Sequence, residues 1–374
     1  MAGLYLHIPF CKQACHYCNF HFSTSLKRME EMCDALIREI QLQRDYLGGA
    51  ALKSIYFGGG TPSLLHPRQL ERLFDTIFTC FVVENDAEIT LEANPDDLCA
   101  DTLSALRNTP VNRLSIGIQS FFPADLVLMH RAHNTLQARA AIELALQAGY
   151  RNLSADLIYG IPGSTDRQWA ENIRILTDYG IPHISAYCLT VETHTALHHF
   201  VQKGKVPPVD EAQAVRQFDF LITALEEQGY IHYEISNFAR PGMFARHNSS
   251  YWRQVPYLGI GPSAHSYDGQ YRQWNIAHNA RYIQAMQEES PTPWFEREHL
   301  TPQHRYNEAI LTSLRTIQGL APEDLPLDFQ TYFLEKIPPL LHNGHIEMAE
   351  GRYRLSRSGK FFADAVAVDL FFTS

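Results

Sequence analysis

Three cysteines lie close together near the start of the chain, in the stretch CKQACHYCNF at residues 11 to 20. Thiolates are soft ligands that select zinc, copper(I) or iron-sulfur clusters. Structural zinc usually takes four ligands, so zinc here would need His16, His21 or a distant residue as the fourth. Three cysteines on one loop are better suited to a 4Fe-4S cubane with one iron left open. The spacing therefore favours a cluster, with zinc as the alternative.

The composition limits where this chemistry takes place. The chain has 374 residues and seven cysteines, an odd number that argues against a secreted disulfide framework. Its net charge of -10 argues against nonspecific binding to nucleic acid or anionic membrane. The N-terminus lacks a signal-peptide pattern, and no run of about 18 apolar residues occurs. We expect a cytoplasmic protein with no transmembrane segment, a small-molecule ligand and no nucleic-acid partner.

Strand-like runs alternate with helical patterns over the first 240 residues. Such alternation predicts a fold of the α/β class, in which about six parallel units curve into a partial (β/α)6-type barrel. Ligands of these folds bind at the carboxyl edge of the strands. The predicted strands are residues 3–8, 54–60, 88–94, 113–119, 153–160, 183–189 and 230–236. The predicted helices are one with apolar positions from Met29 to Ile40, then 67–80, 101–108, 135–148, 166–178 and 211–228.

The alternation stops after about residue 240. We predict a core barrel at 1–240, a connecting region at 241–294 and a cap domain at 295–374. The connecting region is rich in glycine, proline and aromatic residues, which indicates an ordered functional loop region. Two helices (303–317 and 326–341), a hairpin turning at Glu350 and Gly351, and a last helix predict a small winged-helix-like cap. In an acidic protein we do not expect this cap to bind DNA.

The cysteine spacing, with Tyr17 before the third cysteine, resembles the signature of the radical S-adenosylmethionine (SAM) superfamily. The resemblance extends from residue 5 to about 190. It implies that Cys11, Cys15 and Cys18 bind three irons of a 4Fe-4S cluster. The methionine amino and carboxylate groups of SAM then chelate the open iron. In the family, one electron cleaves SAM to methionine and a 5'-deoxyadenosyl radical, chemistry that the cofactors carry.

The resemblance also implies a SAM-binding set at the ends of the predicted strands. Glycines in GGGTP, residues 58 to 62, have no Cβ and allow the backbone to approach the methionine moiety. A tight turn is the alternative for this stretch, and each polar residue alone could serve as a cap, turn or salt-bridge residue. Together and in order they are more specific. The implied set is Tyr5, Tyr17, Gly59, Gly60, Thr61, Glu92, Gln119, Arg131 and Asp156.

Over nearly its whole length the chain is similar to one branch of this superfamily. That branch contains the oxygen-independent coproporphyrinogen III dehydrogenases and the HemW-type haem chaperones. The dehydrogenase pattern continues as C-x3-C-x2-C-x-C, whereas Phe20 occupies the fourth position here. This difference favours the chaperones.

A second motif supports the same choice. HNSSYW, residues 247 to 252, fits the HNxxYW motif of the haem chaperones. The resemblance implies that His247 is an axial haem ligand and that Tyr251 and Trp252 pack on the macrocycle. The alternative is a hydrogen-bonded loop histidine with Trp252 in the core. Weaker ligand candidates are His198, His199 and His265, and Cys188 is expected to be a buried strand residue.

The resulting prediction is a radical SAM-type haem chaperone with three cofactors or cargoes: a 4Fe-4S cluster, SAM and haem. Its partners would be haem, an electron donor and acceptor haemoproteins, which for the family are respiratory enzymes. A homodimer is compatible with the sequence, which does not specify an oligomeric state. We assign no catalytic residue to the chaperone. The alternative is a coproporphyrinogen III dehydrogenase that makes protoporphyrinogen IX by radical oxidative decarboxylation.

Overall fold

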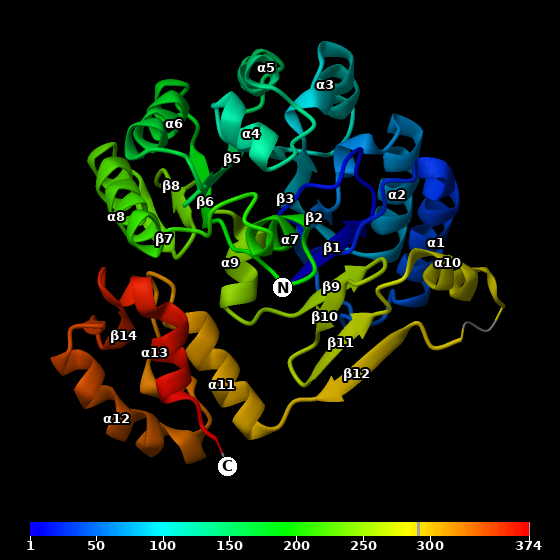
Figure 1. Ribbon diagram of the computed structural model, residues 1–374. Coiled ribbons are helices and arrows are strands. Elements are labelled where there is room, and N and C mark those ends of the chain that lie inside the picture. The colour runs from blue at the N-terminus through cyan, green and yellow to red at the C-terminus, as the bar shows by residue number, and fades with distance from the viewer. Residues whose placement is uncertain (290–291, 374) are drawn as a thin grey trace.

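Twelve strands form one continuous sheet in the computed structural model, which describes residues 1–289 and 292–373 (Figure 1). The strand order is β12-β11-β10-β9-β1-β2-β3-β4-β5-β6-β8-β7. Strands β1 to β6 pair in parallel with their sequence neighbours, so the predicted partial barrel of six α/β units is confirmed. These strands are β1 (Ala2–Ile8), β2 (Leu52–Gly59), β3 (Val83–Ala93), β4 (Arg113–Gln119), β5 (Asn152–Tyr159) and β6 (His183–Cys188).

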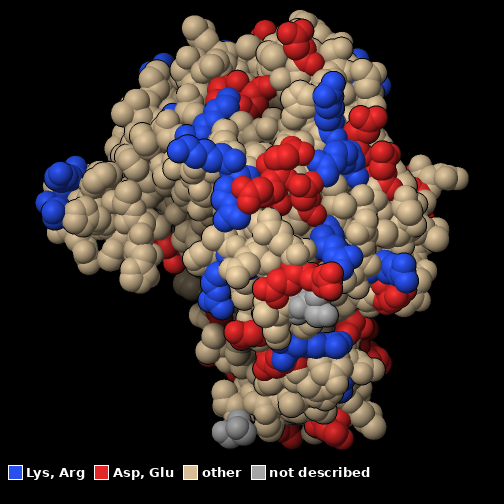
Figure 2. Space-filling view, turned by 90° about the vertical axis from the view of Figure 1, so that its right-hand side faces the viewer, with Lys and Arg blue, Asp and Glu red and all other residues tan. Residues whose placement is uncertain are grey.

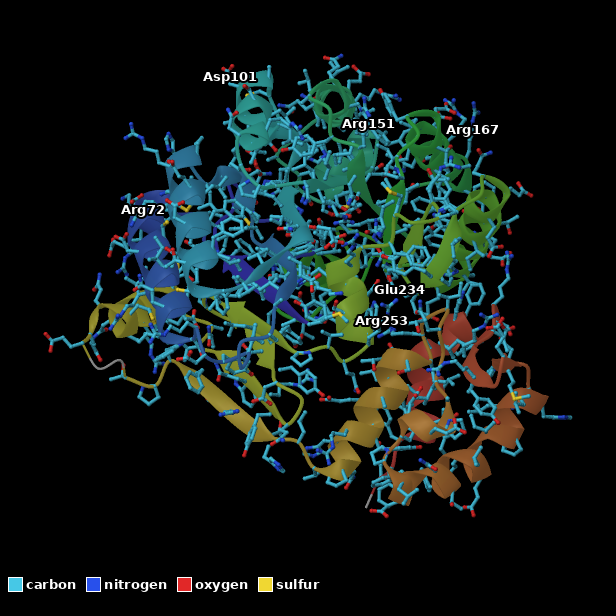
Figure 3. The ribbon with its side chains drawn as sticks, turned by 180° about the vertical axis from the view of Figure 1, so that it is seen from behind. Arg72, Asp101, Arg151, Arg167, Glu234 and Arg253 are labelled. Atoms are coloured by element: carbon cyan, nitrogen blue, oxygen red, sulfur yellow. The ribbon has the colours of Figure 1, made fainter. Side chains whose placement is uncertain are left out.

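Helices cover the outer face of the parallel strands (Figure 1). In α2, Leu70, Leu73 and Ile77 recur at helical spacing and are buried against the sheet. Figure 3 shows charged side chains of this outer layer pointing away from the sheet, including Arg72 and Arg167. The helices are α1 (Met29–Leu42), α2 (Pro67–Cys80), α3 (Ala100–Arg107), α4 (Pro123–Leu128), α5 (Thr135–Gln147), α6 (Asp166–Asp178), α7 (Ala196–Gln202) and α8 (Glu211–Glu227). Short 3-10 turns are η1 (Leu26–Arg28), η2 (Pro62–Leu64), η3 (Pro95–Asp97), η4 (Pro322–Asp324) and η5 (Gly359–Phe362).

Both edges of the parallel sheet differ from the prediction. The single strand expected at 230–236 is a hairpin of β7 (Ile231–Glu234) and β8 (Asn237–Ala239), which pairs antiparallel to β6. The expected loop region after residue 240 instead forms helices and strands. Strand β9 pairs in parallel with β1, and the later strands continue antiparallel. These elements are α9 (Arg246–Trp252), β9 (Tyr257–Ile260), β10 (His265–Tyr267), β11 (Tyr271–Asn275), α10 (Asn279–Gln287) and β12 (Phe295–His299).

A buried carboxylate fastens this extension to the barrel. Glu39 on α1 is fully buried and accepts hydrogen bonds from Gly261 N at 2.7 Å and Asn275 Nδ2 at 2.7 Å. Trp294 Nε1 donates at 3.0 Å, and the Tyr282 hydroxyl donates as well. Burial raises the pKa of Glu39, while these four donors lower it. A carboxylate with this many protein partners serves the structure and has little capacity left for a ligand.

The C-terminal domain has a hydrophobic core of its own, below the barrel in Figure 1. Its predicted helices and hairpin are present, although the first helix ends at Ser313 rather than near 317. Backbone pairing joins it to β7, where Ile317 N donates to Tyr233 O at 2.9 Å. Figure 3 shows Glu234 of β7 at this junction. The elements are α11 (Pro302–Ser313), α12 (Leu327–His342), β13 (Ile346–Ala349), β14 (Arg352–Leu355) and α13 (Ala363–Leu370).

The surface carries mixed charge. On the face shown in Figure 2, basic and acidic side chains lie interleaved. Arg72 of α2, for example, pairs with Glu30 and Asp34 of α1, at 2.5 Å for Glu30 Oε1. Within residues 1–289 and 292–373, we find no helix with the length and apolar character needed to span a bilayer.

Candidate functional site

The cysteine motif occupies the loop that follows β1, at the carboxyl edge of the parallel strands. The base of the loop is closed by two backbone hydrogen bonds, from Cys11 N to Ser23 O at 3.0 Å and from Ser23 N to Pro9 O at 2.9 Å. Its middle is held by the segment after α4, where His16 N donates to Met129 O at 3.0 Å. These bonds hold the three-cysteine loop in place over the barrel.

All seven cysteines are free, and the three motif cysteines are half-buried. Burial raises the pKa of the Cys11 thiol to about 11 and also raises that of Cys18. Both thiols are therefore protonated near neutral pH unless a metal deprotonates them. No three His, Cys, Asp or Glu side chains of the described chain converge as one metal ion would require. Thiolates that each bind a different iron of a cubane need not converge on one point.

Arg131 connects the cysteine loop to the barrel. Its Nη1 lies 3.2 Å from Cys15 Sγ and 3.3 Å from the Tyr17 hydroxyl. Its Nη2 donates to Asn94 Oδ1 at 2.6 Å and to Gly117 O at 3.0 Å. The guanidinium thus lies beside one thiol and at the ends of two strands, and its buried Nε has no hydrogen-bond partner among the described residues. An anionic group bound here would meet a fixed positive charge.

A cavity of about 520 Å³ opens beneath the cysteine loop. We call it the first cavity, and it reaches from Cys18 down into the barrel as far as Asn248. Seven of the nine predicted SAM residues line it: Tyr17, Gly60, Thr61, Glu92, Gln119, Arg131 and Asp156. The fold therefore brings together side chains from five separate strand ends and loops, as expected for ligands at the carboxyl edge.

Two carboxyl groups give the first cavity its electrostatic character. Glu92 accepts from the Tyr56 hydroxyl at 2.7 Å, and Asp156 accepts from the Ser115 hydroxyl at 3.4 Å. Protein surrounds both groups, and burial raises the pKa of Glu92 to about 7 and that of Asp156 to about 6. With so few protein donors, both carboxylates would be stabilised by a cationic or hydroxyl-rich ligand. The ammonium, sulfonium and ribose groups of SAM fit this donor set.

The backbone beside the cavity is strained at Gln119. Gln119 at the end of β4 has φ of 66°, in the left-handed region that side chains seldom adopt. The pairing of β4 with β5 shifts register between Ile116 and Gln119, so this strain accompanies a bulge. Strained residues of this kind often lie at binding sites, where the surrounding structure maintains them.

Tyr5 and Gly59, the other two predicted SAM residues, lie outside the first cavity. The Tyr5 hydroxyl hydrogen-bonds His7 Nδ1 at 3.1 Å, and its ring stacks on Tyr56 at 6.1 Å. Gly59 has φ of 103°, and a Cβ there would collide with the His7 ring. A Cβ at Gly60 would collide with the carbonyl oxygen of Phe10. The glycines thus allow β2 to approach the root of the cysteine loop.

His247 lies in the first turn of α9, one residue after the helix begins. The Glu88 carboxylate accepts from the backbone N–H groups of Arg246 and His247, each at 3.0 Å. The ring is 2% exposed, its Nδ1 is 2.8 Å from Ser54 Oγ, and its Nε2 is 2.9 Å from the Tyr251 hydroxyl. Burial lowers the pKa of His247 to about 3, so the ring is neutral. Axial ligation by His247 would require one of these two hydrogen bonds to break.

The other residues of HNSSYW divide between two spaces. Asn248 lines the first cavity, whereas Tyr251 and Trp252 line a second cavity of about 610 Å³. Tyr5 and His265 line the second cavity too, while His198 and His199 on α7 line neither. Cys188 was expected to be a buried strand residue, but it is half-buried at the end of β6 and faces the first cavity.

Sequence reasoning missed several residues of the first cavity. Tyr56 lies two residues before the glycine run and faces inward with Gly58 by strand alternation, a signal that could have identified it. Arg113 is 2% exposed, with its Nε 4.0 Å from Glu88. A lone arginine opening an apolar strand could have been recognised as inward-facing. Others include Asn19, Asn94, Ser115, Ser185, Tyr187 and Glu192.

Comparison with known proteins places these features in a family. The model of the radical SAM superfamily matches residues 5–176, and that of the HemN C-terminal domain matches residues 300–362. The "Heme chaperone HemW" of Bacillus subtilis (strain 168) is 32% identical over 372 residues, covering 98% of both chains. The protein of the same name from Mycobacterium tuberculosis is 33% identical over 369 residues, covering 97% of this chain and 93% of the relative.

A solved structure shares the fold. The coproporphyrinogen III oxidase HemN from Escherichia coli, described as a radical SAM enzyme, superposes with a TM-score of 0.85 at 24% sequence identity. The match covers 99% of this chain and 89% of that one. At this identity the likeness demonstrates a common architecture of barrel and C-terminal domain.

Proposed function

Because this chain belongs to the HemW family of the radical SAM superfamily, we propose that it is a haem chaperone. It binds a 4Fe-4S cluster, SAM and haem, and it delivers haem to acceptor haemoproteins in the cytoplasm or at respiratory complexes. The observation that carries the proposal is the convergence of the cysteine loop, Arg131, Glu92 and Asp156 on the first cavity. The full-length similarity to chaperones supports the haem part.

Each side chain has a role in this proposal. Cys11, Cys15 and Cys18 hold the cluster, and Arg131 offsets negative charge beside Cys15. Glu92 and Asp156 bind the cationic and hydroxyl groups of SAM. When bound, the cluster and SAM supply one-electron chemistry at this edge of the barrel. The chain's own contribution is to orient SAM and to exclude water.

Phe20 supports a chaperone over a dehydrogenase. It stands where the dehydrogenases have a fourth cysteine, and its side chain is 69% exposed between the two cavities. An exposed phenylalanine can shield a flat apolar cargo but cannot serve as a thiol.

Haem transfer tests the proposal. Anaerobically reconstituted protein is loaded with haem and mixed with an apo-haemoprotein, and the acceptor's absorption spectrum is followed against free haem at equal concentration. We expect one haem per chain and transfer to the acceptor. A second arm supplies coproporphyrinogen, reductant and SAM. Formation of protoporphyrinogen there, without haem transfer, would replace the chaperone by the dehydrogenase.

A further inference from the structure

The second cavity has the size and walls of a site for a flat aromatic ligand. Its volume of about 610 Å³ falls within the range of roughly 300 to 1,000 Å³ typical of small-molecule pockets. Tyr251 and Trp252 of α9 and Tyr257 and Tyr267 of the sheet extension form one part of its wall, and Phe20 forms another. Aromatic rings stack favourably on a planar macrocycle. The cavity thus offers a wall of aromatic side chains from α9 and the sheet extension.

Three histidines line the second cavity, and their hydrogen bonds distinguish them. His7 uses both ring nitrogens, on the Tyr5 hydroxyl at 3.1 Å and on His21 O at 2.9 Å. His21 Nε2 is bonded to Asn279 Oδ1 at 2.6 Å. The exposed ring of His265 has no hydrogen bond to any other described residue. Of the three, His265 has the most freedom to bind a metal.

The backbone holds His265 in a fixed position. It lies on β10, paired with Trp274 of β11. On the other side, a Cβ at Gly259 would collide with the His265 carbonyl oxygen, so β9 and β10 approach as only glycine allows. Gly259 N also donates to Ser266 Oγ at 2.9 Å. A side chain on paired strands is positioned more rigidly than one on a loop.

A charged pair lies at the same cavity. Arg272 Nη2 is 2.9 Å from Glu308 Oε1, across the junction with the C-terminal domain. Arg272 Nε has no hydrogen-bond partner among the described residues, so Glu308 satisfies only part of the guanidinium. Arginine pairs well with carboxylates such as porphyrin propionates, and an incoming carboxylate would compete with Glu308.

We propose that the second cavity is the haem site, with His265 as the axial iron ligand and Arg272 as the partner of a haem propionate. The inference rests on the proposed function, since it places the chaperone's cargo. It separates that cargo from the cluster: Asn19 and Phe20 line both cavities and form the partition between them. Haem and SAM then occupy neighbouring spaces on opposite sides of the residues that follow Cys18.

Haem titration of the full-length, reconstituted protein tests the ligand. We expect His265→Ala to shift the Soret band. It should also weaken haem affinity by about tenfold to a hundredfold, the loss of metal affinity that changes around a metal site commonly cause. Added imidazole should restore the wild-type band. His342→Ala, at the exposed end of α12, is the matched control and should retain the band. An unaltered band in His265→Ala together with a shifted band in His247→Asn would overturn the assignment.

The charged pair has its own readout. Arg272→Gln should weaken haem binding but leave binding of the iron porphyrin dimethyl ester unchanged, because the ester has no carboxylate to pair. Glu308→Gln should strengthen haem binding, because it removes the competing carboxylate. Equal losses for haem and ester in Arg272→Gln would overturn its role. If the wild-type protein bound no haem, the proposed function itself would fail. Normal haem binding by His265→Ala would overturn only the assignment of His265 as the axial ligand.

Discussion

The two cavities differ in chemistry although they share a wall. The first is built from the carboxyl ends of parallel strands and contains thiols, half-buried carboxyl groups and Arg131. The second is built largely from α9 and the antiparallel extension. It contains aromatic rings and the imidazole of His265, which has no hydrogen-bond partner among the described residues. In our proposal, the barrel supplies the site for the cluster and SAM. The extension adds a site for a cargo of another chemical class.

Two carboxylates show the same contrast between ligand sites and structural positions. Glu39 has four protein donors and fastens the extension to α1, whereas Glu92 has the Tyr56 hydroxyl and the Gly59 backbone as donors and faces a cavity. A buried carboxylate without enough protein donors costs stability, which a bound ligand can restore. Glu92 and Glu39 therefore form a matched pair for separating function from folding.

Loss of one cluster ligand gives the largest expected effect. Cys15→Ala should abolish cluster assembly because a cubane cannot be held by two thiolates here, and it should leave the Soret position of bound haem unchanged. Iron and sulfide analysis and haem titration measure the two effects. Cys99→Ala, at an exposed cysteine, is the control. A full complement of iron and sulfide in Cys15→Ala would contradict the assignment of the cluster to the cysteine loop over the first cavity.

Removing the charge of Glu92 gives the second-largest expected effect. Glu92→Gln should lower SAM affinity by about tenfold to a hundredfold, since hydrogen bonds to charged groups contribute about 1.5 to 3 kcal/mol. The cluster should remain intact. Isothermal titration with SAM measures the change, and Glu39→Gln should bind SAM normally while unfolding more easily. Unchanged isotherms for Glu92→Gln would contradict the assignment.

The same carboxyl group predicts a pH dependence of stability. The pKa of Glu92 is raised in the folded state to about 7 from an ordinary value of 4.5. Stability is therefore greatest below the ordinary value and declines as the pH rises through 7. The full shift corresponds to about 3 kcal/mol of unfolding free energy, and solvent screening of this half-buried group reduces it to about 1 to 2 kcal/mol. Denaturant unfolding of the protein without SAM should show this decline, and Glu92→Gln should flatten it. A variant curve parallel to the wild type would contradict this account.

A change in the partition between the two cavities, formed by Asn19 and Phe20, gives the smallest expected effect. If SAM changes haem affinity by some factor, haem must change SAM affinity by the same factor. Phe20→Ala should reduce this coupling, which we expect to be about fivefold, because it removes the side chain that lines both cavities. Haem titrations with and without SAM measure it, and Phe78→Ala at an exposed position of α2 is the control. Equal coupling in Phe20→Ala and the wild type would mean that the cavities are independent.

The sequence was sufficient for the parallel part of the fold and for seven of the nine predicted SAM residues, which line the first cavity. Local patterns define its helices, and α2 and α6 match their predicted bounds. Residues at strand ends converge because parallel strands place their carboxyl ends at one edge. Glu92, Gln119 and Asp156 therefore meet although they are far apart in sequence.

The extension could not be predicted in the same way. Strand β10 has three residues, and β9 pairs with β1, which lies some 250 positions earlier. Such short strands have no reliable local signal and depend on long-range pairing and on Glu39. A motif also does not specify where its side chains point. His247 hydrogen-bonds inside the barrel, while Tyr251 and Trp252 of the same helix face the second cavity.

The central claim is that one chain holds the cluster and haem at the same time, in separate cavities. Stoichiometric haem titration of anaerobically reconstituted protein, with iron and sulfide analysis of the loaded product, tests it most directly. The account predicts one haem and one complete 4Fe-4S cluster per chain, with the reduced cluster's paramagnetic signal still responding to SAM. Loss of the cluster as haem binds, or haem binding only to chains without a cluster, would contradict it.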